Sequence, residues 1–271
     1  MGIPEPSTDA GRVGLRALVA EPRSAVVALD FDGTLAPIVA DPAAARAEPA
    51  AVAALRALVP LVGGVVVVTG RPAAVAVEYG GFEGLGLTVL GQYGAERWEA
   101  GVLTAPEPPP GVAAVRAELP AVLGESGAWV EDKGRALAVH TRRTADPQAL
   151  LEQLRAPLAE LAARHGLMVE PGRYVLELRP PGVDKGGALT EYLAGRPAGA
   201  AVLYAGDDLG DLPAYEALEL RRKGGGPAVL VCSSAVTGER QVAELADRAD
   251  LLVPGPAGVA ELLQALAGAL R

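Results

Sequence analysis

The chain has 271 residues, of which 50% are hydrophobic and 21% are charged, and its formal net charge is −9. This composition excludes a disordered chain, and the length fits one large domain or a domain that carries a sizeable insertion. The acidic balance argues against a nucleic-acid partner, because no run of Lys and Arg is long enough to neutralise a phosphate backbone.

The single cysteine, Cys232, rules out an internal disulfide or a cysteine-based metal site, so we expect a cytoplasmic protein. The segment 1–25 contains acidic residues and prolines before any apolar stretch, which is the wrong order for a signal peptide. No uncharged run approaches the roughly 20 residues that a membrane helix needs. We therefore expect no membrane association, and no obligate protein partner is evident.

Four short apolar runs show no period-2 alternation, which indicates strands buried on both faces of a parallel sheet. Each run ends in a polar or acidic loop, and a helical pattern over 49–61 follows the first run. This alternation predicts an α/β fold whose ligands bind beyond the carboxyl ends of the strands. The four runs are residues 25–29, 65–68, 200–205 and 228–232.

The middle of the chain has a different pattern, which begins with a Pro-rich stretch near Ala105. A helix-like segment comes next, followed by a hairpin with its turn at 132–134, a helix over 146–165 and a strand over 174–178. These elements predict a small α+β domain inserted into the first one. The inserted domain is residues 106–180, and the core consists of residues 21–105 and 181–271.

Asp30 and Asp32 directly follow the first apolar run, in the pattern Asp-x-Asp-Gly-Thr. Two carboxylates held this close repel each other unless a cation or a shared proton compensates, so the pair indicates Mg²⁺. A calcium loop does not fit, because an EF-hand loop follows a helix and has a different pattern. A second motif, Gly-Asp-Asp-x-x-Asp over 206–211, again follows a buried strand. Alone it could be a solvated acidic turn, but together the two motifs predict one metal site.

Thr69, Gly70 and Arg71 follow another predicted strand and offer a hydroxyl and backbone N–H groups to an anion. A simple helix cap is the alternative interpretation. Lys185 begins the helix that returns from the inserted domain to the core. A solvated lysine is the alternative there, but its place ahead of the second acidic motif favours a site residue.

These motifs, in this order and after these strands, resemble the four motifs of the haloacid-dehalogenase-like phosphatases. The insertion lies where that superfamily carries its larger cap, so the resemblance implies a Rossmann-like parallel-sheet core with an inserted α+β cap domain of the C2 type. Further segments are similar to the trehalose-6-phosphate phosphatases. They are residues 30–38, 92–96, 131–134 with 140–142, and 177–180.

The resemblance also implies a mechanism and a cofactor. Asp30 would attack phosphorus to form an aspartyl phosphate, which splits one difficult displacement into two easier ones. Asp32 would protonate the leaving sugar oxygen and then deprotonate the attacking water. Mg²⁺ would be held by Asp30, by the backbone carbonyl of Asp32 and by Asp207.

Phosphate would be bound by Thr69, Gly70 and Lys185, which spread the charge of its equatorial oxygens. Asp208 and Asp211 are expected directly behind the metal ligands.

In the inserted domain, the resemblance implies that Glu131, Lys133 and Glu177 bind the sugar, since carboxylates and ammonium groups together match hydroxyls that both donate and accept. Solvated charges on a small sheet are the alternative. The predicted reaction is the hydrolysis of trehalose 6-phosphate, a small-molecule sugar phosphate, to trehalose and phosphate.

The fourth motif departs from the family pattern, because Gly210 and Leu212 stand where the family usually has Thr and Glu. This departure leaves the exact sugar open. A phosphatase for another glycosyl or trehalose-like pseudo-disaccharide phosphate is the first alternative. A sugar phosphomutase on the same fold and an inactive sugar-phosphate sensor are the others.

Overall fold

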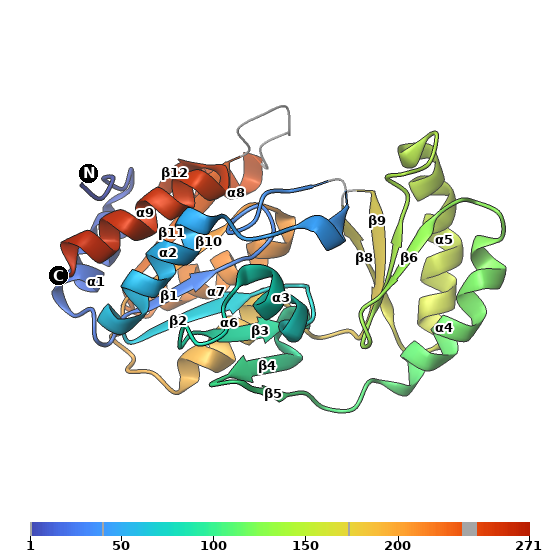
Figure 1. Cartoon of the computed structure of the whole chain (residues 1–271), viewed down its shortest axis with the longest axis horizontal. Coiled ribbons are helices and arrows are strands. Elements are labelled where there is room, and N and C mark those ends of the chain that lie inside the picture. Colours follow the sequence, from blue (N-terminus) through green and yellow to red (C-terminus); the bar gives the residue numbers. More distant parts are fainter. Residues whose placement is uncertain (1, 40, 173, 235–242) are drawn as a thin grey trace. The chain divides into compact units, whose positions relative to one another are not determined.

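The structure is a computed structural model, and it describes every residue except 1, 40, 173 and 235–242. The chain forms two compact units, which we call the core unit and the cap unit (Figure 1). The core unit consists of Met1–Ala105 and Asp184–Arg271, and the cap unit of Pro106–Val183. The cap unit thus ends at Val183 rather than at 180, and the core unit also includes residues before 21.

Within the described residues, the core unit holds one eight-stranded sheet in the order β12-β11-β10-β1-β2-β3-β4-β5. The strands from β12 to β3 run parallel, whereas β4 pairs antiparallel with β3 and with β5. The four predicted strands are confirmed as β1 Val26–Leu29, β2 Gly64–Val68, β10 Val202–Gly206 and β11 Ala228–Ser234. The strands that the apolar pattern did not predict are β3 Thr88–Gly91, β4 Glu96–Glu99, β5 Val102–Thr104 and β12 Leu251–Pro254.

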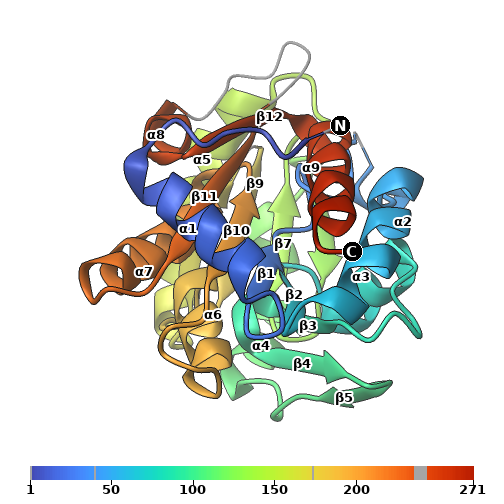
Figure 2. The same cartoon turned by 90° about the vertical axis from the view of Figure 1, so that its left-hand side faces the viewer.

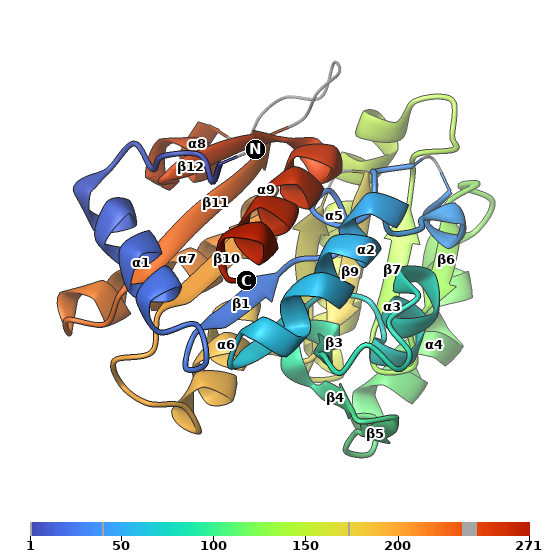
Figure 3. The ribbon, with the colours of Figure 1, turned by 60° about the vertical axis from the view of Figure 1, so that its left-hand side comes forward.

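Helices cover both faces of the core sheet (Figures 2 and 3). One face carries α1 Asp9–Ala20, α2 Pro49–Leu58, α3 Ala73–Gly80 and α9 Gly255–Ala269. The other face carries α6 Lys185–Ala194, α7 Leu212–Lys223 and α8 Ala243–Arg248. Short 3-10 turns lie at Pro42–Ala44, Val59–Leu61, Gln92–Gly94 and Leu209–Asp211. In the part of the chain that the structure describes, no helix is both long and apolar enough to cross a lipid bilayer.

The predicted helix over 49–61 is α2 followed by the 3-10 turn at Val59–Leu61. The α-helix ends early because Pro60 has no N–H to continue the hydrogen-bond ladder.

The packing of strand β1 explains why apolar and polar residues do not alternate in its sequence. Val27 and Leu29 pack in the core cluster that includes α2 and α9, whereas Val26 and Ala28 pack in the one that includes α6 and α7. Because both faces are covered by helices, every position of the strand is apolar. Leu29 lies opposite Ala205 in the parallel register, so the acidic loops after β1 and β10 leave the sheet at the same edge.

The cap unit is an antiparallel sheet in the order β6-β7-β9-β8, with α4 and α5 packed on one face (Figure 1). The predicted hairpin, helix and final strand are confirmed, whereas β8 was not predicted. Leu137 and Val139 of β7 and Leu176 and Leu178 of β9 pack in the cluster that includes the two helices, so the residues between them face the other side. The elements are α4 Pro110–Leu123, β6 Trp129–Asp132, β7 Leu137–His140, α5 Pro147–Arg164, β8 Met168–Gly172 and β9 Val175–Arg179.

A buried carboxylate ties the first segment of the chain to the core sheet. Asp250 is 1% exposed and accepts hydrogen bonds from the Thr8 hydroxyl and from the Arg222 guanidinium. It also accepts from the backbone N–H of Leu230 at 2.7 Å. Thr8 in turn caps α1 by accepting from the N–H of Gly11. One side chain therefore joins the start of α1, the end of α7 and strand β11.

Asp250→Ala leaves the Arg222 guanidinium without its buried partner. We expect the substitution to lower the free energy of unfolding by about 3–5 kcal/mol, measured by urea denaturation. Asp9→Ala is the control, because the Asp9 side chain is 97% exposed and pairs with Arg12 at the surface. An exposed pair contributes little, so this control should unfold close to wild type. Equal effects of the two substitutions would contradict the role given to Asp250.

Candidate active site

Lys185 joins two buried carboxylates at the carboxyl edge of the core sheet. Asp30 is the first residue after β1, and Lys185 is the first residue of α6. The ammonium Nζ of Lys185 lies 2.7 Å from Oδ1 of Asp30 and 2.7 Å from Oδ1 of Asp211. All three side chains are buried. The structure thus brings the predicted nucleophile and the predicted phosphate-binding lysine into direct contact.

Both carboxylate oxygens of Asp211 are occupied by donors. Oδ1 accepts from Nζ of Lys185 at 2.7 Å and from the hydroxyl of Tyr204 at 2.6 Å. Oδ2 accepts from the backbone N–H groups of Asp207 at 2.9 Å and Asp208 at 3.1 Å. Asp211 therefore holds the lysine and the loop after β10 with a single side chain.

Asp207 has an oxygen whose hydrogen-bonding capacity is unused. Its Oδ1 is buried and has no hydrogen-bond partner among the described residues. Gly33 makes room for the carboxylate, because a Cβ there would lie 2.0 Å from Oδ2 of Asp207. Carboxylate oxygens of Asp30, Asp207 and Asp211 all lie within 4.8 Å of one another. Since four donors already occupy Asp211, Asp30 and Asp207 are the side chains that could hold a cation.

The crowded carboxylates shift the proton affinities of the cluster. Burial raises the pKa of Asp30 well above its usual range. The charge of Lys185 opposes this shift, and the neighbouring carboxylate of Asp211 adds to it. Burial and the charges of Asp208 and Asp30 likewise raise the pKa of Asp207. Burial alone would lower the pKa of Lys185, but Asp211 and Asp30 hold that pKa well above its usual range. When all of its carboxyl groups are ionised, the cluster carries more negative than positive charge, and a divalent cation would balance that excess.

Arg71 holds the carboxylate of Asp32 with two hydrogen bonds. Nε and Nη2 of Arg71 lie 2.7 Å from Oδ2 and Oδ1 of Asp32, which makes a bidentate pair. Nη1 donates to the carbonyl of Pro42 at 3.0 Å, and the guanidinium lies over the rings of Phe31 and Tyr79. Sequence reasoning placed Arg71 in the anion-binding motif and missed this pair. The available signal was that both residues follow predicted parallel strands.

The turn that contains Thr69 and Gly70 has fewer free amides than the sequence suggested. The N–H of Arg71 donates to the buried Oγ1 of Thr69 at 3.1 Å. The N–H of Ala73, the first residue of α3, donates to Oε2 of Glu96 at 2.7 Å. These two amides are therefore not free for a phosphate, and the Thr69 hydroxyl is the stronger candidate in this turn.

A strained loop supports the same turn. Gln92 and Tyr93 both adopt left-handed φ angles, of 46° and 59°, which non-glycine residues rarely adopt. Their N–H groups donate to the carbonyls of Arg71 at 2.8 Å and Thr69 at 2.9 Å. Buried Glu96 accepts from Nε2 of Gln92 at 2.8 Å. The segment 92–96, to which sequence reasoning gave no role, therefore holds the Thr69–Arg71 turn in place.

The cap-unit sheet brings the three predicted sugar-binding residues to one face. Glu131, Ala138 and Glu177 lie directly opposite one another in the strand register. Side chains in such a row point the same way, here to the face opposite α4 and α5. Nζ of Lys133, in the turn between β6 and β7, lies 2.6 Å from Oε2 of Glu177. Glu131 pairs with Nε2 of His140 at 3.0 Å.

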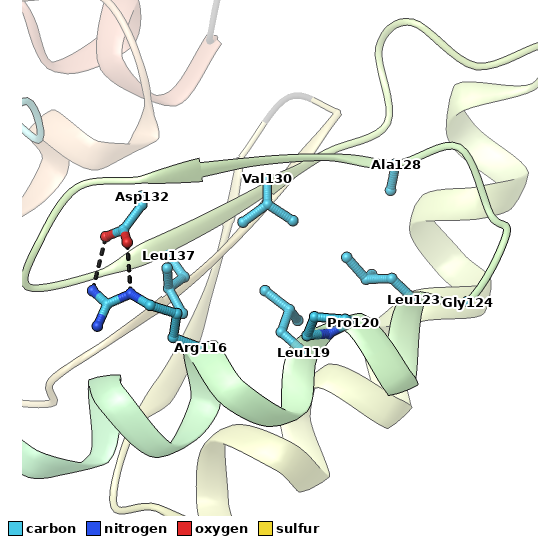
Figure 4. A pocket seen from close by; sticks show the side chains of 9 residues that line it. All are labelled: Arg116, Leu119, Pro120, Leu123, Gly124, Ala128, Val130, Asp132 and Leu137. Carbon is cyan, nitrogen blue, oxygen red and sulfur yellow. Dashed lines mark hydrogen bonds and ion pairs between the residues drawn. The ribbon is translucent and has the colours of Figure 1, made fainter.

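A cavity of about 400 Å³ lies within the cap unit, between α4 and the β6–β7 hairpin (Figure 4). Its lining is mostly apolar and includes Leu119, Val130 and Leu137. At one end Arg116 and Asp132 form two hydrogen bonds, of 2.6 and 2.9 Å. The residues that line it include none of the predicted site residues, so it is not part of the candidate site.

Comparison with known proteins supports the resemblance. A trehalose-phosphate phosphatase of Mycobacterium tuberculosis is 34% identical over 268 residues, which cover 92% of this chain and 63% of the relative. An uncharacterized glycosyl hydrolase of the same organism is 37% identical over 211 residues, which cover 72% of this chain but 15% of that protein. The chain therefore spans less than two thirds of either relative.

The fold is also that of a solved structure. The C-terminal domain of the trehalose-6-phosphate phosphatase of C. albicans superposes with a TM-score of 0.73 over 99% of both chains, at 23% identity. The sequence model of the family described as trehalose-phosphatase matches residues 28–250. With the motifs, the capped α/β fold and this match in agreement, the chain belongs to the trehalose-phosphatase family.

Proposed function

We propose that this chain hydrolyses trehalose 6-phosphate to trehalose and phosphate, with Mg²⁺ as cofactor and an aspartyl phosphate on Asp30 as intermediate. The observation that carries the proposal is the cluster in which Lys185 bridges Asp30 and Asp211 beside the unsatisfied oxygen of Asp207. Phosphoryl transfer depends on positioning and charge neutralisation, which such a cluster supplies. Membership of the family supports the same reaction.

Asp30 is the proposed nucleophile. In the first step its carboxylate forms a bond to phosphorus while the bond between phosphorus and the sugar oxygen breaks. In the second step water attacks phosphorus, which releases phosphate and restores the carboxylate. Lys185 holds Asp30 and would also neutralise oxygens of the phosphate, and the Thr69 hydroxyl and Gly70 would complete the phosphate site.

Asp32 is the proposed general acid and base. It would give a proton to the leaving sugar oxygen and later take one from the attacking water. Arg71 occupies both of its carboxylate oxygens. Each of these oxygens can accept a second hydrogen bond, so the sugar oxygen or the water could bind Asp32 beside Arg71.

The residues at this edge fit a magnesium ion. Mg²⁺ prefers oxygen ligands and few carboxylates, and Asp30, Asp207 and the backbone carbonyl of Asp32 would supply them. The unused Oδ1 of Asp207 and the space left by Gly33 support this fit. Bound there, the ion would supply positive charge against the carboxylates and the phosphate.

Glu131, Lys133 and Glu177 would bind the sugar from the cap-unit sheet. The family departures lie elsewhere, because Gly210 is in the 3-10 turn after β10 and Leu212 is the first residue of α7. Gly210 donates its N–H to Oδ1 of Asp208 at 2.9 Å, and a Cβ on Gly210 would lie 3.0 Å from that oxygen, so a larger residue would crowd it. The departures thus lie in the core unit and do not change the cap residues that are proposed to bind the sugar.

A panel of sugar phosphates tests the substrate. With Mg²⁺ in excess, we expect kcat/KM for trehalose 6-phosphate to exceed that for glucose 6-phosphate and sucrose 6-phosphate by about tenfold or more, measured as phosphate release. A higher kcat/KM for another ester in the panel would show that the substrate is another glycosyl phosphate. Release of phosphate from none of them would contradict a phosphatase.

Asp30→Asn tests the nucleophile. We expect phosphate release to fall by about 10³-fold or more, because a carboxamide is a poor nucleophile. The variant should still unfold cooperatively, since Asn fills the same space. Asp9→Asn, at an exposed carboxylate, is the control and should keep full activity. Activity of Asp30→Asn within tenfold of wild type would show that the nucleophile is another residue.

The raised pKa values of Asp30 and Asp207 predict how stability depends on pH. Between the ordinary carboxyl pKa of about 4 and the raised values, the folded protein binds more protons than the unfolded chain. The metal-free protein should therefore become less stable as pH rises through this window. Mg²⁺ binds the deprotonated carboxylates, so its stabilising effect should grow with pH.

Thermal unfolding with EDTA and with Mg²⁺, from about pH 5 to about pH 8, measures this dependence. Asp207→Asn is the matched variant, and its response to Mg²⁺ should be weaker at every pH. A Mg²⁺ effect of the same size at every pH would contradict a cation held by these two carboxylates.

A further inference from the structure

Tyr204 places its hydroxyl inside the charged cluster, although its position in the chain is that of an apolar core residue. The side chain is 0% exposed, and its hydroxyl donates to Oδ1 of Asp211 at 2.6 Å. The same oxygen accepts from Nζ of Lys185 at 2.7 Å. One carboxylate oxygen is thus shared between a neutral donor and the ammonium that also holds Asp30.

We propose that Tyr204 is a positioning residue for the phosphoryl-transfer site. Through Asp211, its hydroxyl fixes where the Lys185 ammonium lies between Asp211 and Asp30. The inference rests on the proposed function, because Lys185 is taken to neutralise the phosphate.

The fold explains why the hydroxyl reaches this place. In the strand register Tyr204 lies opposite Ala28 and Leu230, and it belongs to the core cluster on the face that α6 and α7 cover. Lys185 is the first residue of α6, and Asp211 directly precedes α7. The phenol therefore extends from the sheet to the point where the two helices begin.

The neighbouring backbone is shaped to let Asp211 into this position. A Cβ on Gly206, at the end of β10, would lie 2.3 Å from the carboxylate carbon of Asp211. No side chain larger than hydrogen fits there, so Asp211 packs directly against the strand that carries Tyr204. The missing side chain at Gly206, the last residue of β10, thus allows the contact between Tyr204 and Asp211.

The charges explain what the hydroxyl does. Lys185 lies between two carboxylates, and its position depends on how strongly each attracts it. A hydrogen bond from Tyr204 satisfies part of the acceptor capacity of Oδ1 of Asp211. Without it, that oxygen would be left to the ammonium alone and would draw Lys185 away from Asp30 and from the phosphate.

Tyr215 supplies a matched control. Its ring meets that of Tyr204 edge to face, with centroids 6.1 Å apart and planes at 90°. Its hydroxyl is also buried but has no hydrogen-bond partner among the described residues. Tyr204→Phe and Tyr215→Phe therefore remove the same atom from the same layer of the core, and they differ in whether that atom bonds to Asp211.

The experiment compares these two variants with wild type in the full chain, with Mg²⁺ and the ester that wild type turns over best. We expect Tyr204→Phe to lower kcat about tenfold, because a hydrogen bond to a charged group is lost, with KM changed less than kcat. The inhibition constant of orthovanadate, which mimics the five-coordinate phosphorus, should rise in parallel. Tyr215→Phe should match wild type in kcat, KM and the inhibition constant. Both variants should need the same Mg²⁺ concentration as wild type for half-maximal activity.

A double-mutant cycle separates positioning from packing. If Tyr204 acts through the lysine, Tyr204→Phe should have little further effect on orthovanadate binding in a Lys185→Met background. The proposal would be overturned if Tyr204→Phe kept the kcat and the orthovanadate binding of wild type. Equal losses of kcat in Tyr204→Phe and Tyr215→Phe would also overturn it. So would effects of Tyr204→Phe and Lys185→Met on orthovanadate binding that are fully additive. Failure of wild type to release phosphate from any sugar phosphate would instead overturn the proposed function, since the vanadate comparison tests Tyr204 independently.

Discussion

Buried carboxylates that repel one another dominate the carboxyl edge of the core sheet. Asp30, Asp207 and Asp211 come within 4.8 Å of one another, and the Lys185 ammonium lies between two of them. Such a cluster is costly unless positive charge and hydrogen-bond donors are supplied. Asp211 accepts hydrogen bonds from four donors, whereas Asp30 shares the Lys185 ammonium with it and Oδ1 of Asp207 has no hydrogen-bond partner among the described residues. Asp30 and Asp207 are therefore the side chains of the cluster that could hold a cation.

The backbone of the core unit brings these mutually repelling carboxylates together. Parallel pairing of β1 with β10 brings the two acidic loops to one edge, and Gly33 leaves the space that the Asp207 carboxylate occupies. Burial and the neighbouring carboxylate of Asp211 raise the pKa of Asp30, so this carboxyl holds its proton more tightly than an ordinary aspartate does. A cation held by Asp30 and Asp207 would lower that pKa and favour the carboxylate that is proposed to attack phosphorus. In the proposed mechanism, metal binding would therefore also activate the nucleophile.

The strand ends and their motifs could be predicted because each is local in the sequence. Apolar runs without alternation indicated the parallel strands, and the acidic residues directly follow them. The bond from Arg71 to Asp32 depends instead on β2 lying beside β1, an order that the sequence does not state. Tyr204 was read as one more apolar position of its strand, because only the fold shows the donors around Asp211. Strand β8 escaped prediction because its last two residues, Pro and Gly, disfavour strands.

The proposed mechanism depends most on a covalent bond between phosphorus and Asp30. Acid quench during turnover of trehalose 6-phosphate, followed by borohydride reduction, converts an acyl phosphate on aspartate into homoserine, which mass spectrometry locates. The proposed mechanism predicts homoserine at position 30, in an amount that depends on both substrate and Mg²⁺. Phosphate release without homoserine at any quench time, or homoserine at another aspartate alone, would contradict it.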